Sequence, residues 1–325
     1  MPNAFSSGRN LAMEAVRATE DAACAAARFM GRGDEMAADR AAVEAMREAL
    51  AGLHIDGVIR IGEGRDDPDS KLAVGGKAGN GDGPRVDVAL MPLEGPTIIA
   101  RGDPNGLSII AMTGEGGFLD APDLYMDKIA VGGGLPEDVV DLDEEPEKNL
   151  KELAKAKGVD VGDLVVCVLD RPRHSKLIAK IREAGARIML IADGDVSGVI
   201  ATAWPASGVD IYMGVGNAPQ GVLSAAALSC AGGRMQGRLV INGESDEKKA
   251  KACGVKDAAR KFTLSEMASG DVTFAATGVT SGAMLLGVRE RHGYAISQSM
   301  VIRSMTGTLR FVESHHEFGR HALRR

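Results

Sequence analysis

Aromatic residues and cysteines are scarce in this sequence. Phe, Trp and Tyr make up 3% of the 325 residues, so aliphatic side chains and Met must fill the core, as in an α/β protein rich in loops. The four cysteines form no C-x-x-C pair and stand at no spacing from a histidine that suits zinc, which argues against a structural zinc site. We therefore expect buried, reduced thiols.

The sequence also lacks a long apolar run and an excess of positive charge. No window approaches the ~20 apolar residues of a membrane-spanning helix, and residues 1–8 lack the basic and apolar regions of a signal peptide. The formal net charge of −7 argues against a dedicated nucleic-acid surface but permits a local basic pocket for a phosphorylated metabolite. These absences predict a soluble, cytoplasmic protein that binds no nucleic acid.

Helices and strands alternate along the sequence. In the first half, apolar spacing and β-branched runs predict helices at residues 9–30 and 37–51 and strands at 58–61, 86–90 and 107–112. Further on they predict helices at 148–157, 174–184, 196–202 and 221–230, and strands at 164–169, 187–191, 211–213, 272–276 and 299–310. The regular alternation after residue 147 indicates a parallel sheet with right-handed crossovers.

An acidic segment at residues 141–147 is the best candidate for a linker, because it combines consecutive carboxylates with a proline. We therefore predict an N-terminal half at 1–147 and a C-terminal half at 148–325. Residues 243–257 are polar and predict a surface excursion, and residues 315–325 predict an irregular basic tail. His315 and His316 in this tail are expected to be solvated, because neighbouring residues of a strand point apart.

The segment 86–97 resembles a phosphatase metal site with two key residues exchanged. Its apolar run breaks at Met91-Pro92, which predicts a strand that leads into a turn. Metal-dependent sugar phosphatases of the lithium-sensitive type carry Asp-Pro-(Ile/Leu)-(Asp/Glu)-Gly-(Thr/Ser) at such a place. There two carboxylates hold hard cations and the hydroxyl positions the attacking water. Here Glu94 is kept, whereas Met91 offers only a soft thioether and Pro96 offers no hydroxyl.

Charged residues follow two of the predicted strands in the second half. Arg171 and Arg173 come directly after the strand at 164–169, where two guanidiniums are well placed for a phosphate; the alternative is a solvated pair of surface charges. Asp193 and Asp195 follow the next strand, where ligands of open α/β sheets collect. The alternative for them is an Asx turn with a helix N-cap.

A glycine-rich loop at residues 214–221 lies between a predicted strand and a predicted helix. It is superficially similar to a dinucleotide-binding loop, but its spacing differs and no acidic residue ends a following strand at the required distance. The loop therefore argues against a nicotinamide site, while the helix N-terminus behind it remains able to accept an anion.

Taken in order, these motifs resemble the class II fructose-1,6-bisphosphatases, the bacterial GlpX-type enzymes, over about residues 10–310. The resemblance rests on residues 31–34, 38–39, 55–57, 61–64, 121–126, 171–174, 193–195, 218–222, 237–238 and 274–278. It implies an α/β fold, the layered sandwich of the lithium-sensitive and FBPase-like sugar phosphatases. It also implies removal of the 1-phosphate of fructose 1,6-bisphosphate by a metal-activated water, with Mg²⁺ or Mn²⁺, in gluconeogenesis or Calvin-type carbon metabolism.

The resemblance gives individual residues expected roles. Asp39 and Glu63 match ligands of one metal, and Glu94 matches a ligand of another. Asp67 matches an acid that supports the nucleophilic water. The positions that match the sugar-phosphate site are Tyr125, Arg171, Arg173, Asp193, Asp195 and Asn217, the last in place of a glycine.

The departures from the family pattern fall at positions where the family has metal-binding or catalytic residues. Glu35 stands for a lysine, Met91 for a metal-binding aspartate, Pro96 for the catalytic threonine and Gln220 for a metal-binding glutamate. Thr97 would supply the hydroxyl only after a shift of one residue in the backbone. Since hard cations depend on charged oxygen ligands, we expect at most one weak Mg²⁺ or Mn²⁺ site, or none.

The turns of the family pattern are kept, whereas its metal-binding and catalytic residues are replaced. This combination predicts a catalytically degenerate relative, a pseudophosphatase with a structural, regulatory or sugar-phosphate-binding role. The alternative is an active metal-dependent sugar phosphatase with altered metal use or a related bisphosphate as substrate. The resemblance implies a homo-oligomer, either a dimer or a tetramer, or a subunit of a larger assembly. The sequence names no partner and no physiological ligand.

Overall fold

The computed structural model describes residues 8–63, 71–291 and 293–318. The chain divides into two compact units: unit 1 comprises residues 1–115 and 271–325, and unit 2 comprises residues 116–270. This division does not fall at the predicted boundary after residue 147. The acidic segment 141–147 lies within unit 2, where Lys261 donates to Asp141 at 2.6 and 2.7 Å and the Asp141 amide bonds to Asn149 at 2.8 Å.

Unit 1 is built on a mixed eight-stranded sheet with the order β12-β13-β11-β4-β3-β1-β2, in which β14 pairs with β13. Its strands are β1 (Asp56–Ile61), β2 (Lys77–Ala78), β3 (Arg85–Glu94), β4 (Leu107–Gly114), β11 (Thr273–Gly278), β12 (Arg289–Arg291), β13 (Tyr294–Arg303) and β14 (Thr308–Glu317). β1 and β3 are parallel, and β11 pairs antiparallel with β4, from which it is far removed in sequence.

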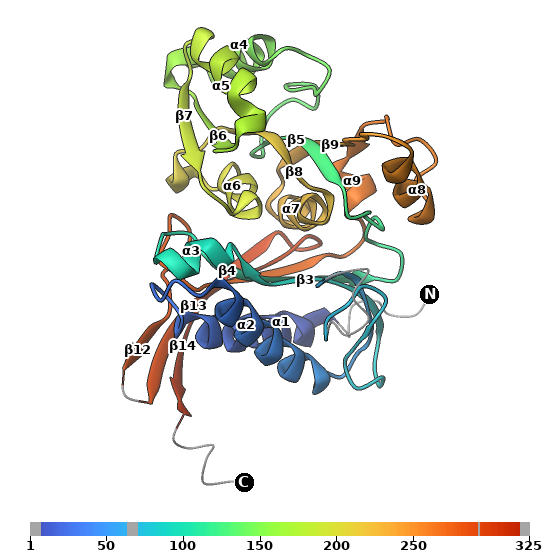
Figure 1. The fold of residues 1–325 in the computed structure, drawn as a ribbon, viewed down its shortest axis with the longest axis vertical. Helices are drawn as coiled ribbons and strands as arrows, with labels where there is room; N and C mark the ends of the chain where they lie inside the picture. Colours follow the sequence, from blue (N-terminus) through green and yellow to red (C-terminus); the bar gives the residue numbers. More distant parts are fainter. Residues whose placement is uncertain (1–7, 64–70, 292, 319–325) are drawn as a thin grey trace. The chain divides into compact units, whose positions relative to one another are not determined.

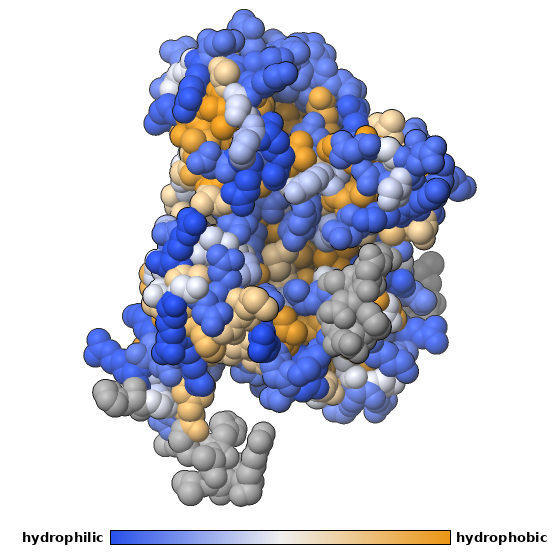
Figure 2. All heavy atoms as spheres, in the orientation of Figure 1, coloured by the Kyte–Doolittle hydropathy of each residue, from blue (hydrophilic) through white to orange (hydrophobic). Residues whose placement is uncertain are grey.

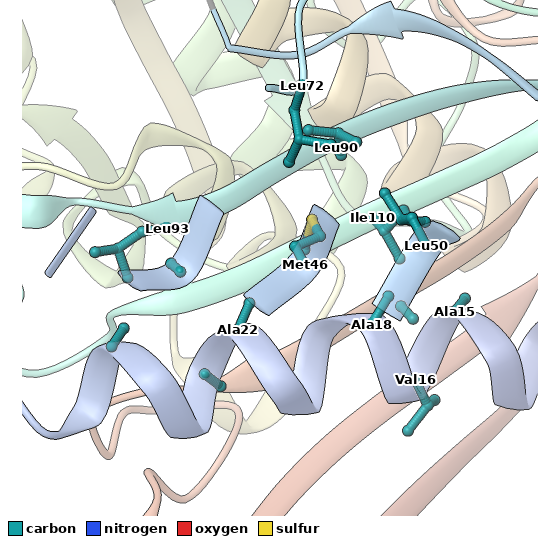
Figure 3. Close-up of a cluster of buried hydrophobic side chains, with 14 of the residues drawn as sticks. Ala15, Val16, Ala18, Ala22, Met46, Leu50, Leu72, Leu90, Leu93 and Ile110 are labelled. Atoms are coloured by element: carbon teal, nitrogen blue, oxygen red, sulfur yellow. The ribbon is translucent and has the colours of Figure 1, made fainter. Parts of the chain in front are cut away.

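Helices α1 (Gly8–Ala27) and α2 (Glu35–Ala51) lie against this sheet (Figure 1), and the short α3 (Pro96–Arg101) follows β3. The alanines of α1 let this helix approach α2 and the sheet closely, because small side chains allow the backbones of packed elements to lie near each other. Figure 3 shows Ala18 and Ala22 of α1 beside Met46 and Leu50 of α2, with Ile110 of β4 above them. The predicted helices are confirmed, with α2 capped by Asp34, which accepts from the Ala37 amide at 2.9 Å.

Unit 2 has a mixed six-stranded sheet with the order β10-β9-β5-β8-β6-β7. Its strands are β5 (Tyr125–Val131), β6 (Val165–Leu169), β7 (Arg187–Ile191), β8 (Ile211–Asn217), β9 (Arg234–Leu239) and β10 (Phe262–Thr263). Its helices are α4 (Pro146–Lys157), α5 (Ser175–Glu183), α6 (Asp195–Ala201), α7 (Ala218–Ala231), α8 (Glu244–Ala252) and α9 (Leu264–Met267), with 3₁₀ turns at Val161–Asp163, Pro172–His174 and Pro205–Ser207.

The parallel part of this sheet is β7-β6-β8, as the strand–helix alternation predicts. α4 and α5 cover one face and α6 and α7 the other (Figure 1). α4 buries Leu150 and Leu153 in the core of unit 2. The outer surface of unit 2 around α4 is mainly hydrophilic (Figure 2). No helix within the described residues is long and apolar enough to cross a membrane.

Three sequence predictions are wrong in detail. β3 does not break at Met91-Pro92 but continues to Glu94; the proline is accommodated because β1 pairs only as far as Ala89 and the β4 register shifts after Met91. The predicted strand at 299–310 is instead the hairpin of β13 and β14. β14 includes His315 and His316, so this part of the predicted tail is regular. The predicted surface excursion at 243–257 is mostly exposed, as expected, and it contains α8.

Candidate functional site

The carboxyl ends of β1 and β3 bring two predicted metal ligands to one edge of the unit 1 sheet. The strands are parallel and pair from Asp56 with Arg85 to Ile61 with Ala89, so their ends point the same way. Glu63 follows β1, and its amide bonds to Leu72 O at 2.9 Å. Glu94 is the last residue of β3 and is 2% exposed. Such strand ends are where open α/β sheets bind ligands.

Asp39 of α2 and Glu63 form an electrostatically coupled pair of carboxylates. Burial raises the pKa of Asp39. Burial also raises the pKa of Glu63, and the negative charge of Asp39 adds to the effect, so that this pKa reaches about 7. Two half-buried carboxyl groups whose pKa values are raised are able to bind a hard divalent cation, which would displace protons from them.

The other predicted metal ligands do not join this pair. In residues 8–63, 71–291 and 293–318, no group of three or more His, Cys, Asp or Glu side chains is arranged to hold a metal ion. Met91 is half-buried on β3 and pairs with Ile109 of β4. Asp67, which was predicted to support the nucleophilic water, lies outside the described residues.

The turn after β3 shows how Pro96 is accommodated. Gly95 has a φ of 76°, in the left-handed region that favours glycine, and Pro96 opens α3. A proline at the start of a helix loses no hydrogen bond, since its N–H would be unpaired there. Thr97 follows in the first turn and is half-buried, so the only hydroxyl of this turn sits one residue beyond the expected position.

Backbone hydrogen bonds fix the start of α2 beside α3. The Gly31 amide bonds to Ile99 O and the Gly33 amide to Ala100 O, both at 2.9 Å. Glu35, the first residue of α2, is exposed. The exchange of a lysine for Glu35 therefore places a negative charge at the surface of this corner without touching the bonds that hold it.

Unit 2 brings Arg171, Arg173 and Tyr125 together at the carboxyl ends of its parallel strands. The Arg173 guanidinium donates to Val215 O at 3.0 and 2.8 Å, and its carbon lies 4.9 Å from the centre of the Tyr125 ring. Arg171 donates to the carbonyl oxygens of Asp170, at 3.1 Å, and Ala192. Among the described residues, both guanidiniums thus bond to backbone carbonyls rather than to carboxylates, and their charge remains available to an anion.

His174 connects the ends of β6 and β8. It is 2% exposed, and its Nε2 accepts from the Val215 amide at 2.8 Å, so the proton lies on Nδ1, which donates to Leu169 O at 2.7 Å. Burial lowers the pKa of His174, which keeps the ring neutral. From the sequence, His174 belongs to the matched segment 171–174, but no role was predicted for it.

Asp193 and Asp195 flank the turn from β7 into α6. Asp193 accepts from the Gly194 amide at 2.9 Å. Gly194, with a φ of 82°, is the N-cap residue of α6 and has no side chain to cap it, so the alternative of an aspartate N-cap is wrong. Asp195 is 8% exposed and forms an ion pair with Lys128 of β5, which is fully buried. The only indication of Lys128 in the sequence is a lysine inside an apolar run.

Asn217 and Gln220 lie where β8 enters α7. Asn217 is the exposed N-cap residue of α7, without a side-chain cap hydrogen bond. The Gln220 Oε1 atom is buried and meets no hydrogen-bond donor among the described residues. A buried amide oxygen without a partner is uncommon, because nearly all buried polar atoms in proteins are hydrogen-bonded.

Comparisons with known proteins agree with this architecture, whose two mixed sheets and covering helices are those of an α/β sugar phosphatase. The family model described as bacterial fructose-1,6-bisphosphatase, glpX-encoded, matches residues 9–316. The chain therefore belongs to this family, the class II fructose-1,6-bisphosphatases.

Two curated relatives illustrate the similarity. A D-fructose 1,6-bisphosphatase class 2/sedoheptulose 1,7-bisphosphatase of Synechococcus sp. (strain JA-2-3B'a(2-13)) is 40% identical over 331 residues, which cover 94% of this chain and 95% of the relative. A protein of the same name from Trichodesmium erythraeum (strain IMS101) is 40% identical over 334 residues, covering 95% and 96%. The similarity thus extends over nearly the whole length of both relatives.

Proposed function

We propose that this chain binds a phosphorylated sugar at the carboxyl ends of β6, β7 and β8 in unit 2, and that it hydrolyses the phosphate ester only weakly. The observation that carries the binding part is the pair Arg171 and Arg173, whose hydrogen bonds within the described residues all go to backbone carbonyls. Guanidiniums held in this way keep further N–H donors for a phosphate and lose little side-chain freedom on binding.

The polar groups around the two arginines suit a sugar. The Tyr125 ring holds Arg173 from one side, and the carboxylates of Asp193 and Asp195 stand at the neighbouring strand end. Carboxylates accept hydrogen bonds from sugar hydroxyls, whereas guanidiniums bind the phosphate. This division of donors and acceptors supports a ligand that carries both groups.

The weak hydrolysis is inferred from the exchanged groups in unit 1. Loss of one group that stabilises the transition state typically costs ~10²–10³ in rate, and this chain has Met91, Pro96 and Glu35 at three positions of that kind. Such groups act as a unit, so their effects do not simply multiply. Thr97 is displaced by one residue from the position of the missing hydroxyl.

Asp39 and Glu63 are the residues that fit a Mg²⁺ or Mn²⁺ ion. A bound ion of this kind polarises a phosphoryl oxygen and lowers the pKa of a water molecule. The chain's own contribution is the pair of carboxylates. Burial raises both pKa values, and the negative charge of Asp39 adds to the effect at Glu63; a bound cation would favour the charged form of both groups. Met91 contributes no oxygen, and Gln220 contributes at most a neutral one, so we propose a single weak site.

A second candidate function is an active sugar bisphosphatase that acts on fructose 1,6-bisphosphate or sedoheptulose 1,7-bisphosphate. Two observations favour it: the names of the relatives, which are 40% identical over nearly the full length, and the Asp39–Glu63 pair, which retains the donors for one metal. This candidate needs a hydroxyl and a second metal ligand from residues other than Pro96 and Met91.

One experiment separates the two candidates. The purified full-length chain is assayed for phosphate release from both bisphosphates with Mg²⁺ and with Mn²⁺, and its binding of fructose 6-phosphate is measured by calorimetry. We expect binding with little phosphate release. Turnover of ~1–10³ s⁻¹, the usual enzyme range, would establish the second candidate, and a chain that neither binds nor hydrolyses would contradict both.

A further inference from the structure

Lys128 is a fully buried cation beneath the proposed sugar-phosphate site. It lies in the middle of β5, and none of its side chain is exposed. Its ammonium group forms an ion pair with Oδ2 of Asp195 and donates to Asn217 O at 3.3 Å. Lysine is almost never fully buried unless it is paired, so this position has a specific requirement for the charge.

Gly216 of β8 makes the contact possible. A Cβ atom at this residue would lie 2.0 Å from Asp195 Oδ2 and 2.8 Å from Lys128 Nζ, which is closer than any real side chain allows. Glycine therefore lets the strand pass directly over the ion pair. The contact depends on three elements that are separate in sequence, since Lys128 belongs to β5, Gly216 to β8 and Asp195 to α6.

The ammonium group joins the two segments that carry the sugar-binding candidates. One is the turn from β7 into α6, where Asp195 is the first helical residue. The other is the junction of β8 with α7, where Asn217 is the N-cap residue. A single buried cation thus fixes the distance between two strand ends without reaching the surface itself.

We propose that Lys128 is a positioning residue for the sugar part of the ligand, an inference that rests on the proposed function. By pairing with Oδ2, it fixes the orientation of the Asp195 carboxylate, so that the carboxylate's remaining acceptor sites serve sugar hydroxyls. The phosphate is bound by Arg171 and Arg173, whose hydrogen bonds do not involve Lys128.

The alternative is an ion pair that only stabilises the fold. The two possibilities predict different effects of a Lys128 substitution on the affinity for a ligand that has no sugar hydroxyl groups. A positioning role affects a sugar phosphate and leaves inorganic phosphate unaffected, because phosphate needs only the guanidiniums. A general loosening of the fold would weaken both ligands together.

The test is calorimetric titration of the full-length chain with fructose 6-phosphate and with inorganic phosphate. In Lys128→Met we expect fructose 6-phosphate to bind about tenfold more weakly, the effect of losing a hydrogen bond to a charged group. Inorganic phosphate should bind as in the parent, and Lys128→Arg should restore part of the sugar-phosphate affinity. Equal weakening of both ligands, or no weakening of either, would overturn the proposal.

A double-variant cycle keeps the test valid if Lys128→Met folds poorly. Asp195→Asn removes the carboxylate that Lys128 is proposed to position, and the combined variant contains no unpaired buried charge. We expect the combined variant to bind fructose 6-phosphate as weakly as Asp195→Asn alone, since Lys128 acts through Asp195. Additive losses would overturn the proposal. A parent chain that binds neither ligand would instead overturn the proposed function and this inference with it.

Discussion

Burial of Glu63, together with the negative charge of Asp39, raises the pKa of the Glu63 carboxyl to about 7. The folded chain therefore holds a proton on Glu63 over a pH range in which the unfolded chain has lost it, from the ordinary pKa of 4.5 up to about 7. Below this range both states hold the proton, and above it neither does.

The first prediction concerns stability as a function of pH. The free energy of unfolding should fall as the pH rises from about 4.5 to about 7 and then stay level, and Glu63→Gln should remove ~2–3 kcal/mol of this fall. Denaturant titrations of both proteins at several pH values measure it, with Glu48→Gln, an exposed residue of the same helix as Asp39, as control. An identical pH dependence in the parent and Glu63→Gln would contradict the assignment.

The second prediction concerns metal binding. A divalent cation must displace the proton of the pair, so Mg²⁺ or Mn²⁺ should raise the melting temperature more at pH 8 than at pH 5.5. The combined change Asp39→Asn and Glu63→Gln should abolish the difference, whereas Glu48→Gln should preserve it. Scanning calorimetry at fixed metal concentration measures this effect. A shift of equal size at both pH values would show that the ion binds elsewhere.

The third prediction tests the arginine pair. Arg173→Gln should weaken the binding of fructose 6-phosphate about tenfold to a hundredfold, because a charge-assisted contact to phosphate is lost. It should weaken inorganic phosphate by a similar factor. Arg182→Gln, an exposed arginine of α5, serves as the matched control and should change neither affinity. If the control lowered affinity as much, only the general positive charge of unit 2 would matter.

The fourth prediction is a gain of activity. The combined change Glu35→Lys, Met91→Asp, Pro96→Thr, Asn217→Gly and Gln220→Glu should give a folded chain with metal-dependent phosphatase activity above the parent. Glu35 and Asn217 are exposed, and the first position of α3 tolerates threonine as well as proline. No single reversion should suffice, because the groups act as a unit.

Phosphate release from fructose 1,6-bisphosphate measures this gain, and thermal unfolding is the control for folding. A folded quintuple variant without activity would show that the chemistry also depends on residues 64–70, whose sequence departs from the family pattern as well.

The fifth prediction concerns the close approach of β8 to the buried ion pair. Gly216→Ala should destabilise the chain by ~1–3 kcal/mol, the usual cost of forcing a group into a filled space. Gly162→Ala is the matched control, since its nearest neighbour would lie at 3.7 Å, and it should change stability by no more than ~0.5 kcal/mol. Equal stability of the two variants, measured by urea unfolding, would mean that the side chains around Lys128 rearrange at little cost to accommodate the added methyl group.

Local patterns predicted most elements of the fold but not how unit 1 is completed. α1, α2, β6 and α5 follow from apolar spacing, because each depends mainly on its own residues. β5 was missed, since Asp127 and a buried Lys128 interrupt its apolar run. The two compact units differ from the predicted halves because β11 pairs with β4, Thr273 opposite Met112, and no local pattern records a contact between segments so far apart.

The candidate sugar-phosphate site was predictable from the sequence where its residues come directly after the carboxyl end of a strand. Arg171, Arg173 and Asp195 were expected at strand ends because parallel strands present their carboxyl ends together. Lys128 and His174 were not, since their roles come from burial and from partners on other elements. The Asp39–Glu63 pair was recognised by resemblance alone, because the electrostatic influence of Asp39 on Glu63 depends on how α2 packs against the sheet.

The Gly31 and Gly33 amides belong to a turn, yet each is bonded to a carbonyl at the end of α3. Their protons should therefore exchange with solvent only when α3 separates from that turn, and their protection would report the opening of the corner directly. Since neither bond involves a side chain, exchange at these two amides should be the same in the parent and in variants of Glu35, whose side chain is exposed. The main chain alone thus holds the corner at these residues, while the charge beside it can change.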